Sequence, residues 1–109
     1  MGVDYACETF YSAIRFALVS DASLHERLDS VISGVCHLQR DSFPDEHVWD
    51  EFRKLVNETT KRGTRHQGDG RIHATISQMS DKEAKECLQA AFDVFSHVAK
   101  AFGRTEFVI

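Results

Sequence analysis

The strongest constraint on the fold is a helix-start signal that is followed by one long amphipathic stretch near the end of the chain. Ser80 and Glu83 have the spacing of a capping box, in which each side chain satisfies a backbone N–H of the first helical turn. Apolar residues then recur at helical spacing: Ala84, Cys87, Leu88, Ala91, Val94, Phe95, Val98 and Phe102. This pattern predicts a long helix with one face for a core and one for water.

Three further helices and one short helical piece are predicted upstream from the same kinds of signal. They cover about residues 4–19, Ser23 to about Leu38, a start near residues 42–44 to Gly63, and about residues 71–78. Ser23 and Glu26 form a second capping box, and Pro44 suits the first turn of a helix. The short connections favour antiparallel neighbours. We predict a single all-α domain over residues 1–109, an antiparallel four-helix bundle with a short extra helix before the last helix.

The first predicted helix has apolar residues on both sides. Its broad apolar face consists of Val3, Cys7, Phe10, Tyr11, Ile14, Ala17 and Leu18. Tyr5 and Phe16 project from the opposite side, where large apolar groups need either a neighbouring element or a second molecule to cover them. Residues 107–109, Phe-Val-Ile, are one candidate cover. We predict instead that Tyr5 and Phe16 form an interface and that the protein is a homodimer.

Charge and composition narrow the class of protein. The chain of 109 residues has a net charge of −4, which makes nucleic acid an unlikely partner. It has three cysteines, an odd number that favours a reducing cytosol over secretion. No apolar run is long enough to span a bilayer, and the N-terminal residues do not resemble a signal peptide. We therefore expect a cytoplasmic protein without a membrane association.

Six histidines raise the question of a metal site. Five histidine–carboxylate pairs have a spacing of four and can share a helix face, as His47 and Glu51 do. Metal sites in helical bundles use Glu-x-x-His pairs that point inward, and no histidine here has a carboxylate three residues before it. The pairs are interpreted as surface contacts, and we predict no metal and no cofactor.

A basic patch surrounds the glycine-containing linker of residues 63–70. Its members are Lys61, Arg62, Arg65 and Arg71. They are a candidate site for an anion or an acidic partner. The alternative is that they only keep a polar loop soluble.

Arg40, Asp41 and His47 provide the strongest enzymatic alternative. Their layout, an arginine and a polar residue followed by a spacer and a histidine, is similar to that of HEPN-type ribonucleases. That resemblance implies a metal-independent ribonuclease or a toxin–antitoxin component, with Arg40 and His47 acting on RNA across a dimer cleft. In the non-catalytic interpretation, Arg40 instead interacts with the end of the second helix and His47 lies on the surface.

Four segments resemble a group of small uncharacterised bacterial helical proteins of unknown function. They are residues 23–28, 41–46, 70–75 and 79–84. The resemblance implies a helical fold and a bacterial origin. From the whole sequence we predict a small cytosolic helical interaction or adaptor protein that self-associates and does not catalyse a reaction.

Overall fold

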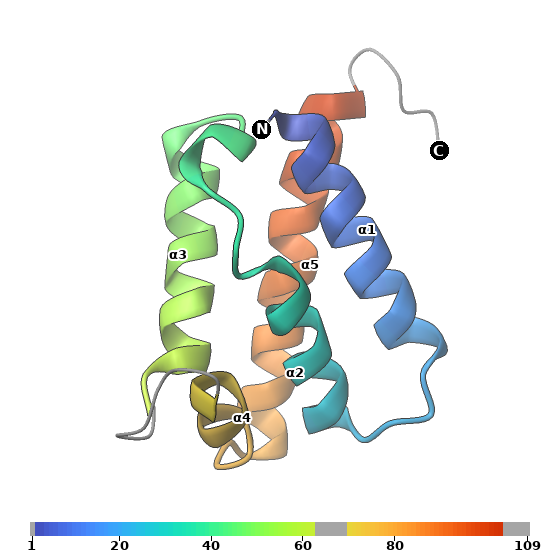
Figure 1. Cartoon of the computed structure of the whole chain (residues 1–109), viewed down its shortest axis with the longest axis vertical. Helices are drawn as coiled ribbons and strands as arrows, with labels where there is room; N and C mark the ends of the chain where they lie inside the picture. The colour runs from blue at the N-terminus through green and yellow to red at the C-terminus, as the bar shows by residue number, and fades with distance from the viewer. Residues whose placement is uncertain (1, 63–69, 104–109) are drawn as a thin grey trace.

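The predicted C-terminal helix organises the structure (Figure 1). The computed structural model describes residues 2–62 and 70–103, and these residues form helices and no strand. The elements are α1 (Val3–Val19), α2 (Leu24–Val35), the short 3₁₀ helix η1 (Arg40–Ser42), α3 (Glu46–Thr60), α4 (Arg71–Ile76) and α5 (Asp81–Gly103). Helix α5 contacts α1, α2 and α3, so three of the other helices pack around it. The all-α prediction is confirmed.

Both predicted capping boxes are present. The Ser80 N–H donates to Oε1 of Glu83 at 2.9 Å, and the Glu83 N–H donates to Oγ of Ser80 at 3.1 Å. The bond from the Ser80 N–H lowers the pKa of the Glu83 carboxyl. Ser23 and Glu26 make the same reciprocal pair at the start of α2. The two helix starts therefore lie where the sequence places them.

Removing the Ser80 cap is expected to lower the free energy of unfolding by about 1 kcal/mol. In Ser80→Ala the N–H of Glu83 loses its acceptor. Because Ser80 is exposed, the substitution does not alter the packing of the core. Urea denaturation measures the effect. Ser12→Ala, an exposed position within α1, is the matched control and should leave stability almost unchanged. Equal stability of Ser80→Ala and the parent would contradict the cap.

Two buried clusters make up the core. The first contains Ala6, Cys7, Phe10, Val35, Leu38, Phe43, Val48, Phe52, Val94, Val98 and Ala99. The second contains Ala17, Leu28, Val31, Ile32, Leu55, Ile76, Ala84 and Ala91. Val3 at the start of α1 and Phe102 near the end of α5 both pack against the first cluster. The first cluster therefore joins the N-terminal end of α1 to the C-terminal end of α5.

The start of α3 and the end of α2 differ from the prediction. Phe43 precedes Pro44 and is extended, because the proline ring disfavours helical geometry at the residue before it. The helix begins only at Glu46, and the Asp45 carboxylate accepts a hydrogen bond from the Val48 N–H at 3.0 Å. Helix α2 ends at Val35 and not at about Leu38 as predicted. Leu38 is nevertheless buried, because it lies in the turn that follows the helix. The predicted end at Gly63 lies outside the described residues.

The apolar face predicted for α1 is too broad. Tyr11 is 52 % exposed and Leu18 is 77 % exposed, although both were expected in the core. Helix α1 packs against α2 and α5 through a narrower stripe that contains Ala6, Phe10 and Ala17. A helix with neighbours on one side buries only part of its circumference, so apolar residues at the edge of the stripe remain in water.

Candidate functional site

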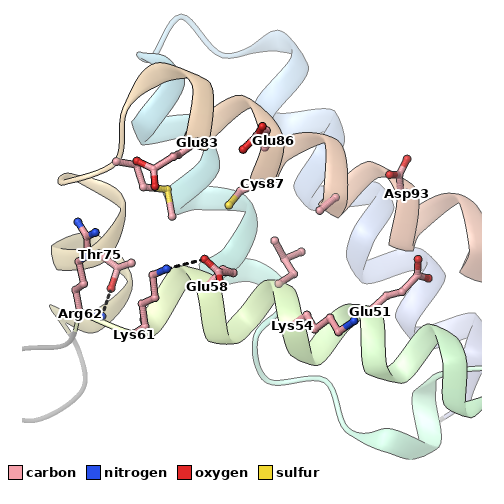
Figure 2. Close-up of a pocket in the computed structure, with 13 residues that line it drawn as sticks. Glu51, Lys54, Glu58, Lys61, Arg62, Thr75, Glu83, Glu86, Cys87 and Asp93 are labelled. Atoms are coloured by element: carbon pink, nitrogen blue, oxygen red, sulfur yellow. Dashed lines mark hydrogen bonds and ion pairs between the residues drawn. The ribbon is translucent and has the colours of Figure 1, made fainter.

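A groove lies between α3 and α5, and α4 borders it at one end (Figure 2). Its volume is about 470 Å³. The lining residues are Glu51, Lys54, Leu55, Glu58, Lys61, Arg62, Thr75, Met79, Glu83, Glu86, Cys87, Ala90 and Asp93. We call this hollow the α3–α5 groove. Its two long walls come from helices that are far apart in the sequence.

The floor of the α3–α5 groove is apolar. Leu55 of α3 is buried, and Met79, Cys87 and Ala90 are half-buried beside it. Burial raises the pKa of the Cys87 thiol, and the nearby carboxylates, Glu58 first, raise it further. The thiol is therefore protonated at neutral pH and behaves as a small hydrophobic group rather than as a nucleophile.

The walls of the groove carry charge of both signs with an acidic excess. Five carboxylates and three cations line the groove, which gives a net charge of −2. Glu83, Glu86 and Asp93 come from one side of α5. On the α3 side, Lys61 Nζ lies 2.8 Å from Glu58 Oε2, so this cation is paired within its own wall. The α5 wall, by contrast, carries the three carboxylates of Glu83, Glu86 and Asp93.

The predicted basic patch is only partly at the groove. Lys61 and Arg62 line the groove, and the backbone N–H of Arg62 donates to Oγ1 of Thr75 at 2.9 Å. This bond ties the end of α3 to α4. Arg71 is exposed at the start of α4 and does not line the groove. Arg65 lies outside the described residues, so a joint site of all four residues stays a prediction.

Glu51 joins the groove to a neighbouring pair of histidines. His97 Nδ1 of α5 lies 2.8 Å from Glu51 Oε1, and His47 Nε2 lies 4.0 Å from the same oxygen. The two imidazole rings are 6.3 Å apart between centroids. Among residues 2–62 and 70–103, no group of three or more histidine, cysteine or acidic residues is arranged to hold a metal ion. Glu51 acts here as a link between α3 and α5.

Arg40 and His47 line two different hollows. Arg40 Nε donates to Glu46 Oε1 at 3.1 Å, and its Nη1 donates to the Phe43 carbonyl at 3.2 Å. It borders a hollow beside Tyr5, whereas His47 borders one that residues of α3 line. The arginine therefore supports the turn that precedes α3. The ribonuclease alternative stays a prediction, because catalysis across a dimer would need a second copy.

Tyr5 and Phe16, the predicted interface pair, have different surroundings. Tyr5 is half-buried, packs against the first core cluster, and its hydroxyl lies 2.9 Å from Nε2 of His37. Phe16 is 56 % exposed. Within the monomer, Tyr5 therefore already has the neighbours that its ring and hydroxyl need. Phe16 remains an exposed aromatic side chain.

The sequence did not indicate the groove, because its walls meet only in the tertiary structure. The α5 wall alone left a signal: Glu83, Cys87, Ala90 and Asp93 are three or four residues apart and share one side of the helix. Comparison of the chain with known protein families, with curated proteins and with solved structures gave no match. Within the described part of the chain, no helix is both long enough and apolar enough to cross a membrane.

Proposed function

We propose that the protein is a small cytosolic interaction protein without catalysis, which binds a segment of a partner protein in the α3–α5 groove. The scaffold in this proposal is an antiparallel four-helix bundle with α4 as the short extra helix. The observation that carries the proposal is the apolar floor of Leu55, Met79, Cys87 and Ala90 between charged walls. Apolar floors with polar rims are typical of surfaces that bind other proteins.

The charges of the groove define the chemistry of the partner segment. Glu83, Glu86 and Asp93 on the α5 wall favour lysine or arginine on the side of the segment that lies over α5. The small side chains of Cys87 and Ala90 leave room for one or two apolar side chains on the floor. A short amphipathic helix with basic flanks meets both requirements.

A photoreactive amino acid in place of Ala90 tests this proposal in living cells of the source organism. We expect one discrete protein adduct, because position 90 lies on the floor of the groove. The matched control is the same amino acid at Lys82, an exposed position of α5 that does not line the groove. The adduct should be lost when Glu86 and Asp93 are both replaced by lysine.

Adducts of equal yield at positions 82 and 90, or no adduct at 90, would contradict groove binding. An RNA adduct, together with RNA cleavage that His47→Ala abolishes, would favour the ribonuclease alternative. Mass spectrometry of the adduct identifies the partner residues in contact with position 90. A site next to lysine or arginine is the expected result.

A further inference from the structure

Two histidines converge on one carboxylate at the end of the α3–α5 groove that lies away from α4. His97 Nδ1 lies 2.8 Å from Oε1 of Glu51, and His47 Nε2 lies 4.0 Å from the same oxygen. Figure 2 shows Glu51 of α3 and Asp93 of α5 at this end of the groove, with Thr75 of α4 at the other. Neither histidine lines the groove. The two rings can therefore change the charge at its edge without filling it.

Both imidazole side chains reach solvent. The side chain of His97 is 40 % exposed and that of His47 is 79 % exposed. A histidine in contact with water ordinarily changes its charge between about pH 5 and about pH 8. Aspartate and glutamate ordinarily take up a proton only at about pH 4, and lysine and arginine lose theirs only above about pH 10. Between about pH 8 and about pH 6, the charge at this end of the groove therefore changes through the two histidines.

The fixed charges around the two histidines balance. They come from α3, from the turn before it and from α5, and they are Arg40, Glu46, Asp50, Glu51, Arg53, Lys54, Asp93 and Lys100. Four are carboxylates and four are cations. The charged residues of α1 lie across α5 from this site, because α1 and α3 are on opposite sides of α5 (Figure 1). Protonation of His47 and His97 consequently changes the local balance from neutral to positive.

The other described histidines lie elsewhere. His25 of α2 contacts the Met79 carbonyl and His73 of α4 contacts α2, so both lie at the α4 end of the groove. The charged residues of α2 lie in its first two turns, at this same end. His37 is in the turn after α2 and does not line the groove. His66 lies outside the described residues. Among the described histidines, the pair at Glu51 is therefore the one that acts on the far end of the groove.

We propose that His47 and His97 regulate the α3–α5 groove by pH, so that protonation of both weakens the binding of a basic segment. This inference rests on the function proposed above and adds its regulation. The residues that line the groove have a net charge of −2. Two protonated histidines beside Glu51 bring the sum to zero. They also pair with the carboxylate that a lysine or arginine of the segment would otherwise contact.

The exposure of these groups sets the expected size of the effect. An ion pair between exposed groups changes a binding constant by about threefold. We therefore expect the dissociation constant for a basic segment to rise roughly tenfold from about pH 8 to about pH 6, when both histidines gain a proton. The rise should be smaller at high salt concentration, because dissolved ions screen exposed charges.

Paramagnetic relaxation by a cationic and an anionic nitroxide, measured by NMR, reports the electrostatic potential in the groove without a partner. The methyl group of Ala90 is the reporter on the groove floor. The methyl group of Ala13 is the reference, in a hollow whose described lining residues include no histidine. From about pH 8 to about pH 6, the ratio of cationic to anionic relaxation at Ala90 should fall about twofold in the parent. In His47→Gln/His97→Gln the ratio should stay constant.

His73→Gln is the matched control for the double variant. The His73 side chain is 79 % exposed, as is that of His47, but it lies at the α4 end of the groove. This variant should keep the response of the parent at Ala90. Circular dichroism checks that each variant is folded. An unchanged ratio at Ala90 in the parent, or an equal change in the double variant, would overturn the inference.

Cross-linking at position 90 separates this inference from the proposed function. The photoreactive variant is irradiated in a lysate of the source organism at about pH 8 and about pH 6, with and without His47→Gln/His97→Gln. The adduct yield should fall at the lower pH only where both histidines are present. Equal yields at the two pH values would leave groove binding in place and overturn its regulation by pH. No adduct at either pH value would contradict groove binding itself, and the regulation with it.

Discussion

Phe10→Ala is expected to lower the free energy of unfolding by about 3–5 kcal/mol, the largest effect of any single truncation proposed for this chain. Phe10 is fully buried in the first core cluster, where its ring meets that of Phe52 edge to face at 6.0 Å between centroids. The substitution removes this contact and leaves a cavity between α1 and α3, because a close-packed core relaxes only in part around a deleted side chain. Urea denaturation followed by circular dichroism measures the loss.

Phe16→Ala is the matched control for Phe10→Ala. It removes the same atoms from the same helix, but Phe16 is 56 % exposed, so the loss should stay below about 1 kcal/mol. Similar losses in the two variants would show that the buried stripe of α1 is assigned to the wrong side. The experiment therefore tests the orientation of α1 directly.

Leu28→Ala is expected to lower the free energy of unfolding by about 2–5 kcal/mol, because Leu28 belongs to the second core cluster. Leu28 is fully buried on α2 among residues that include Ile76 of α4 and Ala84 of α5. This side chain therefore stabilises the packing of three helices at once. Differential scanning calorimetry and urea denaturation both measure the effect, which appears as a lower midpoint.

Leu18→Ala supplies the control for Leu28→Ala, because it is the same substitution at a side chain that is 77 % exposed. Its effect should be within about 0.5 kcal/mol at submicromolar protein concentration. At that concentration, mass action minimises a contribution from self-association. A loss for Leu18→Ala as large as for Leu28→Ala would contradict the burial that distinguishes the two leucines.

The elements were predictable where a local signal defined them. Ser23 and Ser80 carry their own start signals, since a capping box is made by residues three apart. The start of α3 was placed too early because Pro44 has two local effects. It is favoured in a first helical turn, yet it also forces Phe43 to be extended, and the second effect prevailed.

The candidate sites were much less predictable than the helices. Tyr5 was predicted to form an interface with Phe16, and the contact of its hydroxyl with His37 in the turn after α2 was not predicted. Glu51 was assigned to a surface pair with His47 on its own helix, and in addition to that pair it lies 2.8 Å from His97 and so joins α3 to α5. Both contacts link residues that are more than thirty positions apart, which a helical wheel of a single element cannot represent.

The sequence by itself determined that this chain forms amphipathic helices, and it determined where two of them begin. Periodicity and capping depend on residues within one or two turns of each other, so they can be recognised in the sequence of a single helix. Only the tertiary structure decided which half of each broad apolar face is covered. Tyr11 and Leu18 are exposed because neighbouring helices cover only one side of α1. The α3–α5 groove has the same origin, since its walls meet only once α3 packs against α5.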